Sequence, residues 1–410
     1  MIFSRIQFLV NRGVAATLFL VSLVACQDAE KTGQVKQQSI AAEERQQIEV
    51  PAYFTADSAT KLGNHLDSIF TQLHKKSGFN GTVLVTKYDQ VLYKGAFGYS
   101  DFSRKDTLTT QTAFQLASVS KQFTAMAIMM LKEQGKLAYD DSVQQHLPYF
   151  PYHGITIRQL LTHRSGLGNY TYFSDELWPD RSEPITNQDV LQLMATYHPP
   201  VYYEPDTHFD YSNTGYMVLA SIVAKVAGMP YATFLQKHIF GPLKMQNTFT
   251  YSKNVAALTG KVASGHTGGR RKRSPDYLDT VLGDKGIYST VEDLYKWDQA
   301  LYTGKLVKQE TLVEAFTGSR KKKRDEDYGF GWRIRTVESG DTIVYHGGLW
   351  HGYATYLLRN PKDHSALIVL SNVPNGSFRH LKELQKFLYP EQSKMAAASK
   401  KTSKTAANKL

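Results

Sequence analysis

A serine and a lysine lie three residues apart at the start of a buried-looking segment. Ser118 and Lys121 lead into residues 122–134, which are apolar almost all the way round a helix, and Gly135 ends the run. The pattern predicts a buried helix with Ser118 near its N-terminus and Lys121 one turn later on the same face. Because a desolvated lysine can remove the proton of a serine hydroxyl, the pair could form an activated nucleophile.

The same spacing occurs twice more, at Ser58 with Lys61 and at Ser319 with Lys322. The first pair lies in a polar helix start and the second lies inside a basic run. Neither leads into a buried helix, so the spacing alone does not identify a nucleophile.

A second polar group precedes another predicted helix. Tyr211 and Asn213 lie in a loop before the helical pattern of residues 216–228. A phenol can carry the proton of a serine when a lysine stabilises the phenolate, and an amide can hold a substrate carbonyl. An ordinary helix entry is the alternative interpretation.

A third group combines a histidine with two glycines. His346, Gly347 and Gly348 follow the strand pattern of residues 342–345. The glycines allow a ligand or another chain to approach the backbone, and the next N–H group suits an oxyanion donor. Residues 266–268 (His-Thr-Gly) are an alternative, which we interpret as a surface loop because no strand pattern precedes them and the basic residues 270–273 follow.

The remaining pattern predicts an α+β fold. Strands are expected at residues 81–87, 90–99, 330–337, 342–345, 353–358 and 366–371, and helices at 59–75, 187–197, 216–228, 289–301 and 378–388. An antiparallel sheet would therefore combine strands from both ends of the chain. Helices would flank it, and a mostly helical lobe, at about residues 135–280, would be inserted between its strands.

The N-terminus predicts export and lipid anchoring. Residues 1–26 have a basic start and a short apolar run, and they end in Leu-Val-Ala-Cys, which resembles a lipobox with Cys26 as the lipidated residue. An ordinary cleaved signal with an unused thiol is the alternative. We expect residues 27–51 to be a flexible tether, 52–390 the folded domain and 391–410 a disordered Lys-rich tail. Gln27 favours an outer-membrane location, facing the periplasm or the cell surface.

Composition argues for a globular body and against nucleic-acid binding. The chain has 410 residues, 42% of them hydrophobic, and a net charge of +11. Residues 270–273, 320–324 and 394–409 carry four, five and five positive charges, which together exceed the net charge. The basic excess is therefore confined to loops and the tail, where solvated charge is the usual condition. No zinc-hydrolase ligand spacing appears, and Cys26 is the only cysteine, so no internal disulfide is possible.

Together these motifs resemble the serine β-lactamase and penicillin-binding-protein superfamily, in particular its class C β-lactamase-like branch. Residues 160–167, 241–245 and 286–290 also resemble segments of this family. The resemblance implies a β-lactamase/transpeptidase-like fold in which Ser118 forms an acyl-enzyme while Lys121 and Tyr211 share the proton transfers. Asn213 would orient the substrate. The residues His346, Gly347, Gly348 and Leu349 would bind it, with the N–H groups of Ser118 and Leu349 as the oxyanion hole. No metal or organic cofactor is implied.

Two departures from the family pattern bear on the substrate. His346 stands where many relatives have Lys, and Gly347 stands where many have Thr, whose hydroxyl helps to bind a substrate carboxylate. An ester or a D-amino-acid peptide is therefore expected at least as much as a β-lactam. The alternative is an inactive envelope binding or sensor protein with the same fold. The sequence predicts neither the natural substrate nor the oligomeric state.

Overall fold

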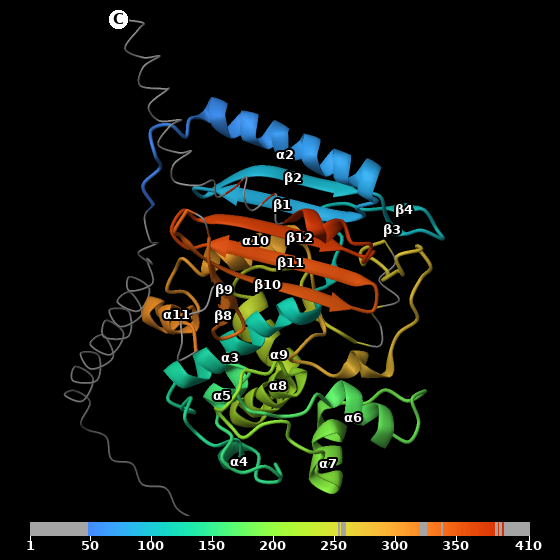
Figure 1. Cartoon of the computed structure of the whole chain (residues 1–410), viewed down its shortest axis with the longest axis vertical. Helices are drawn as coiled ribbons and strands as arrows, with labels where there is room; N and C mark the ends of the chain where they lie inside the picture. The colour runs from blue at the N-terminus through green and yellow to red at the C-terminus, as the bar shows by residue number, and fades with distance from the viewer. Residues whose placement is uncertain are drawn as a thin grey trace, which may run out of the picture. The chain divides into compact units, whose positions relative to one another are not determined.

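The main sheet joins strands from the two ends of the chain (Figure 1). Its seven strands run in the order β2-β1-β12-β11-β10-β9-β8, and every neighbouring pair is antiparallel. The strands are β1 (Gly81–Lys87), β2 (Gln90–Phe97), β8 (Glu326–Tyr328), β9 (Arg333–Thr336), β10 (Thr342–Trp350), β11 (Tyr353–Asn360) and β12 (Ser365–Ser371). The predicted α+β class and the sheet built from both ends of the chain are confirmed.

A computed structural model describes residues 48–252, 255, 260–319, 326–337, 339–381, 384 and 388. The predicted signal peptide with Cys26, almost all of the tether and the Lys-rich tail lie outside these residues. The domain boundaries predicted from the sequence therefore stay predictions.

The two faces of the sheet bury different side chains. In β1, Val83 and Val85 belong to one apolar cluster and Leu84 belongs to another. The first cluster packs beneath helix α2 (Ala56–Ser77) through Leu66 and Phe70. The second is the large core shared with the other helices. This alternation follows from the two-residue period of a strand, so a one-residue slip would exchange the two faces.

Most helices lie between the two groups of strands in the sequence. They are α3 (Lys121–Glu133), α4 (Val143–His146), α5 (Ile157–Leu161), α6 (Tyr170–Leu177), α7 (Asn187–Tyr197), α8 (Asn213–Ala227), α9 (Tyr231–Leu235), α10 (Val291–Ala300) and α11 (Gln309–Ala315). Helices α3 and α8 are buried over most of their lengths and pack against each other. Within the described ranges no single helix could span a bilayer; α8 passes that test only together with residues 231–240, from which it is bent by 76°.

A small three-stranded sheet includes the residues just before the turn that carries Ser118. Strand β5 (Phe114–Gln115) pairs with β7 (Ile287–Ser289), which in turn pairs with β6 (Phe249–Thr250). This small sheet fixes the start of the 3₁₀ turn η1 (Ala117–Ser120), which precedes α3.

Two sequence interpretations need correction. The strand pattern was expected to end before His346, but β10 continues to Trp350, because its later residues pair with β11 up to the contact of Trp350 with Tyr353. The segment beginning at His266 was expected to be a surface loop. It is a loop, but His266 is 1% exposed, because its ring packs on Phe102 and its backbone N–H donates to the Asn372 carbonyl.

Candidate active site

Ser118 lies in the tight turn η1, directly before helix α3. Ala117, the residue before it, has a φ of 48°, an uncommon value for a residue with a side chain. The turn is held from both sides by Ile287, whose carbonyl accepts from Leu116 N–H at 2.7 Å and whose N–H donates to Ser120 Oγ at 3.3 Å. Strained backbone at a fixed position is typical of functional sites, because the surroundings must impose it.

Lys121 is the first residue of α3 and is completely buried. Its ammonium donates to Ser118 Oγ at 3.2 Å, to Asn213 Oδ1 at 2.8 Å and to the Asp284 carbonyl at 3.0 Å. The three donors of an ammonium are thus matched by three neutral acceptors. None of them carries a charge, so the charge of Lys121 is hydrogen-bonded but is not neutralised by a contacting carboxylate.

The loop that supplies the Asp284 carbonyl is tied to two helices, α3 and α7. Thr124 Oγ1, on α3, donates to the Gly283 carbonyl at 2.6 Å. The Asn187 side chain, at the start of α7, exchanges two hydrogen bonds of 2.8 Å with the backbone of Leu282. These bonds fix the acceptor that faces Lys121, and they place a backbone group at the centre of the site.

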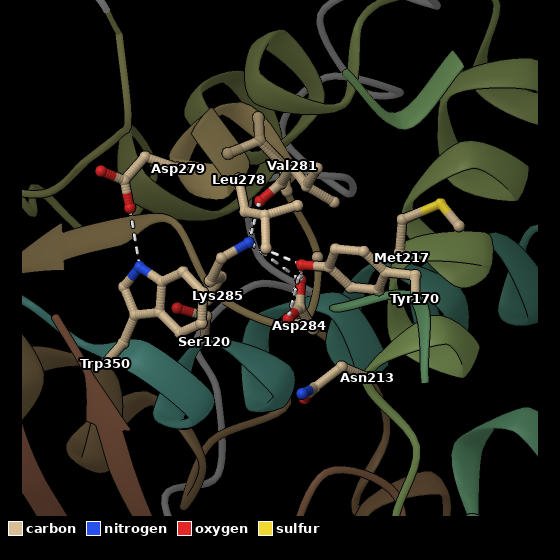
Figure 2. A network of polar contacts seen from close by, with 12 residues as sticks. Ser120, Tyr170, Asn213, Met217, Leu278, Asp279, Val281, Asp284, Lys285 and Trp350 are labelled. Atoms are coloured by element: carbon tan, nitrogen blue, oxygen red, sulfur yellow. Dashed lines mark hydrogen bonds and ion pairs between the residues drawn. The ribbon is translucent and has the colours of Figure 1, made fainter. Parts of the chain in front are cut away.

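A second buried lysine follows in the same loop (Figure 2). Lys285 donates to Tyr170 Oη at 2.6 Å and to the Val281 carbonyl at 3.1 Å, and it lies 3.8 Å from the Asp284 carboxylate. Tyr170 Oη donates to that carboxylate in turn, at 3.1 to 3.2 Å from its two oxygens. Burial lowers the pKa of Lys285, although the Asp284 charge opposes this effect.

Trp350, at the end of β10, closes this network. Its indole Nε1–H donates to Asp279 Oδ1 at 2.7 Å, and its ring lies 4.9 Å from Lys285 Nζ (Figure 2). The strand that carries the third motif is therefore fixed to the loop that carries the Lys121 acceptor.

Tyr211 lies against Lys121 through its ring, whose centroid is 4.9 Å from Nζ. The Tyr211 hydroxyl is buried and has no hydrogen-bond partner among the described residues. His163 packs against the same ring at 4.2 Å, and burial lowers the pKa of His163 well below its usual range. The phenol therefore has an uncharged imidazole on one side and the Lys121 ammonium on another.

His346 is buried and both of its ring nitrogens are engaged. Nδ1 lies 2.7 Å from the Gly347 carbonyl, which can only accept, so Nδ1 carries the hydrogen. Nε2 then accepts from the Tyr328 hydroxyl at 2.9 Å. Burial lowers the pKa of His346 well below its usual range, and the charges of Lys121 and Arg333 lower it further. The imidazole is therefore neutral.

The second half of β10 passes close to the turn that holds Ser118. Strand β9 pairs with residues 342–345 only, so the next five residues of β10 have β11 on one edge and η1 on the other. A Cβ on Gly348 would lie 2.4 Å from the Leu116 carbonyl oxygen, whereas one on Gly347 would meet nothing nearer than 3.7 Å. Thr355 Oγ1 donates to the same carbonyl at 2.6 Å. Gly348 is thus required for this approach and Gly347 is not.

The structure brings together most of the predicted site residues. Ser118, Lys121 and Asn213 share hydrogen bonds, and the Tyr211 ring contacts Lys121. Gly348 packs against η1, whereas Leu349 is 69% exposed. By contrast, Ser58 lies in the first turn of α2, where the exposed Lys61 pairs with Asp57, and Lys322 lies outside the described residues.

Sequence reasoning missed three contributors to the site. The Asp284 carbonyl is a backbone group, so its residue type gives no signal. His163 and Arg333 are placed by packing between distant segments. A charged pair directly before the buried strand β7, Asp284 and Lys285, was the one available sequence signal.

Comparisons with known proteins agree with this geometry. The family model described as Beta-lactamase matches residues 66–388. The chain is 38% identical over 324 residues to Penicillin-binding protein 4* of Bacillus subtilis (strain 168), covering 75% of this chain and 71% of that protein.

Solved structures share the fold. A penicillin-binding protein from Bacillus halodurans superposes with a TM-score of 0.69 at 24% identity, covering 77% of this chain and 98% of the other. The D-amino acid amidase from Ochrobactrum anthropi SV3 gives 0.64 at 23% identity, covering 78% and 94%. The family match and the 38% identity together establish that this chain belongs to the Beta-lactamase family, within the serine β-lactamase and penicillin-binding-protein superfamily.

Proposed function

We propose that this protein is a serine hydrolase of the class C β-lactamase-like type, which acts through an acyl-enzyme on Ser118. The observation that carries the proposal is the contact between Lys121 and Ser118. The lysine is completely buried, its ammonium lies 3.2 Å from Ser118 Oγ, and its other two acceptors are neutral oxygens. A purely structural buried lysine is expected to have a carboxylate partner, because an uncompensated buried charge is costly.

The proposed reaction uses groups already in contact. Ser118 Oγ attacks the acyl carbonyl, and its proton passes to Lys121 or to Tyr211, which lie against each other. The leaving group takes up a proton from the same pair, and water then releases the acyl group by the reverse route. The N–H of Ser118, near the start of the helical turn η1, and that of Leu349, on β10, would stabilise the oxyanion.

The first test is covalent labelling of Ser118. Intact-mass spectrometry of the full chain after treatment with a fluorophosphonate should show one adduct. The adduct should disappear in Ser118→Ala and persist in Ser58→Ala, which removes the serine of the exposed Ser58 and Lys61 pair. No adduct on the wild-type chain with a fluorophosphonate or a penicillin would favour the alternative, an inactive envelope binding or sensor protein.

The substrate class is proposed to be an ester, an amide or a D-amino-acid peptide, with β-lactams as a further class. The neutral His346 supports this choice, because it offers no charge to a substrate carboxylate. The likeness of the fold to the D-amino acid amidase makes D-amino-acid amides a direct trial. The lifetime of a penicillin adduct separates the classes: a β-lactamase releases it within seconds, whereas a penicillin-binding esterase or peptidase retains it.

We further propose that the chain is exported and anchored in the cell envelope through lipid on Cys26. The lipobox-like sequence ending at Cys26 supports this location. Metabolic labelling with an alkyne fatty acid should mark the wild-type chain and not Cys26→Ser. Equal labelling of both chains, or recovery of both in the soluble fraction, would contradict the anchor.

A further inference from the structure

The cation that the family pattern often places at the start of the third motif is missing from this position. His346 is 1% exposed, and its two nitrogens are bonded to the Gly347 carbonyl and to Tyr328. It therefore carries no charge and has no free donor. A positive charge beside Tyr211, other than that of Lys121, must come from another residue.

Arg333 lies where such a charge could act. It is the first residue of β9, and its Cα is paired with Tyr345, the residue before His346. Its guanidinium carbon lies 5.5 Å from the centroid of the Tyr211 ring and 6.0 Å from that of Tyr328. Within the described part of the chain it forms no ion pair, whereas Arg335, two residues along the same strand, lies 3.6 Å from Glu326. Among the described residues, no carboxylate therefore pairs with the charge of Arg333, which lies next to the Tyr211 ring.

The other groups around Tyr211 do not supply a second charge. Burial keeps His163 neutral and raises the pKa of Tyr328 well above its usual range. Tyr216, on α8, is also buried with a raised pKa. Asp210, the residue before Tyr211 in the chain, has a carboxyl whose pKa burial raises, and a carboxyl can supply no positive charge. The ring of Tyr211 therefore lies near two cations, Lys121 at 4.9 Å and Arg333 at 5.5 Å.

We propose that Arg333, rather than His346, provides the second positive charge of this site and stabilises negative charge on the Tyr211 oxygen during proton transfer. Arg333 is then a positioning residue that acts through Tyr211. The inference rests on the proposed serine hydrolase function, because it assigns Tyr211 a share in the proton transfers. A planar guanidinium suits the role, since it can lie over an aromatic ring and keeps its charge at every relevant pH.

The test is the pH dependence of Ser118 acylation in Arg333→Gln. Labelling by a fluorophosphonate and turnover of p-nitrophenyl acetate, both without a carboxylate, are measured from pH 5 to 10 in the full chain. The acid limb of both profiles should move to higher pH by about one unit, so that labelling on that limb falls about tenfold. At the high-pH plateau the variant should match the wild type, which also shows that it is folded.

Two further variants separate charge from packing. Arg333→Lys should restore most of the wild-type profile, because it retains the charge. Arg335→Gln, which removes the neighbouring arginine, should leave the profile unchanged. Superimposable profiles of wild type and Arg333→Gln would overturn the proposal. A wild-type chain that is never labelled would overturn the proposed function, a result distinct from this one.

Discussion

Two buried lysines contact the same residue, Asp284, but they meet different oxygens of it. Lys121 donates to the Asp284 carbonyl, and its other acceptors, in Ser118 and Asn213, are also uncharged. Lys285 lies 3.8 Å from the Asp284 carboxylate and is linked to it through Tyr170. The charge of Lys285 is thus compensated, whereas that of Lys121 is not. The difference is consistent with the proposed roles, in which Lys285 holds the loop in place and Lys121 takes part in proton transfer.

The largest expected effect removes the uncompensated lysine. In Lys121→Met, fluorophosphonate labelling of Ser118 should slow by about 10³-fold, the size expected for loss of a positioned acid or base. The control is Lys61→Met, in the exposed Ser58 and Lys61 pair, which should label at the wild-type rate. A Lys121→Met chain that labels as fast as the wild type would mean that Lys121 has only a structural role, the role assigned to Lys285.

The next change removes the charge that compensates Lys285. Asp284→Asn keeps the carbonyl that faces Lys121 but removes the carboxylate that forms an ion pair with the buried Lys285. The free energy of unfolding should fall by about 3 to 5 kcal/mol, as found when one partner of a buried pair is lost. Urea denaturation measures this change, and labelling of the folded fraction should be little affected. A large loss of labelling with unchanged stability would reverse the roles assigned to the two sides of Asp284.

A substitution in β10, which packs against the turn that holds Ser118, changes neither of the two lysines. Gly348→Ala places a methyl group against the Leu116 carbonyl, so it should lower the free energy of unfolding by about 1 to 3 kcal/mol and slow labelling. Gly347→Ala is the matched control, because its new atom would meet nothing nearer than 3.7 Å. Equal effects of the two substitutions on urea denaturation and labelling would contradict the close approach of β10 to η1.

A smaller effect is expected from a substitution that removes one hydrogen bond of Lys285 and leaves the contacts of Lys121 unchanged. Tyr170→Phe removes the hydroxyl that Lys285 contacts at 2.6 Å and that donates to Asp284. The free energy of unfolding should fall by about 1 to 3 kcal/mol, the cost of a buried group left without its hydrogen bond. The labelling rate of Ser118 should not change. A labelling defect larger than the stability defect would show that the two lysines are coupled in catalysis.

The smallest expected effect is on how the free energy of unfolding changes with pH, and it comes from His163. His163 is buried with a lowered pKa, because of desolvation and then the Lys121 charge, so the unfolded chain binds a proton that the native chain does not. Stability should therefore fall as the pH drops below the unfolded value near 6.5. Between pH 6.5 and 5.5, His163→Asn should lose about 1 kcal/mol less than the wild type in urea denaturation. Asparagine suits the site because residue 163 has a φ of 56°. Identical pH dependence in the two chains would mean that His163 titrates normally.

Local signals predicted much of this fold. The helix expected at residues 187–197 is α7, which Thr186 caps by accepting from Asp189 N–H. The strand patterns at residues 81–87 and 90–99 are separated by two residues, Tyr88 and Asp89, which join β1 and β2 and both have positive φ, as a two-residue hairpin requires. The spacing of Ser118 and Lys121 did place the two side chains within hydrogen-bonding distance. In each case the interacting residues lie within one helical turn or one hairpin, so the local sequence is sufficient to predict the interaction.

Other parts of the site depend on contacts between distant segments. Arg333 reaches Tyr211 because β9 pairs with β10, and no pattern within residues 333–336 reveals that pairing. The end of β10 was missed because glycines favour strands weakly, yet Gly348 is needed where the strand passes Leu116. His266 was expected to be exposed because basic residues follow it, but contacts with Phe102 and Asn372 bury its ring.

The pairing of β1 with β12 also sets the order in which the chain can fold. Gly81 is paired with Ser371, so the centre of the main sheet cannot close until residue 371 has been synthesised. Long loops must be closed before such contacts form, which makes folding slow and leaves the first hairpin without its neighbour in the meantime. For a chain exported as proposed, the late closure of the sheet leaves the polypeptide unfolded until β12 is available. An unfolded chain can pass through a membrane channel.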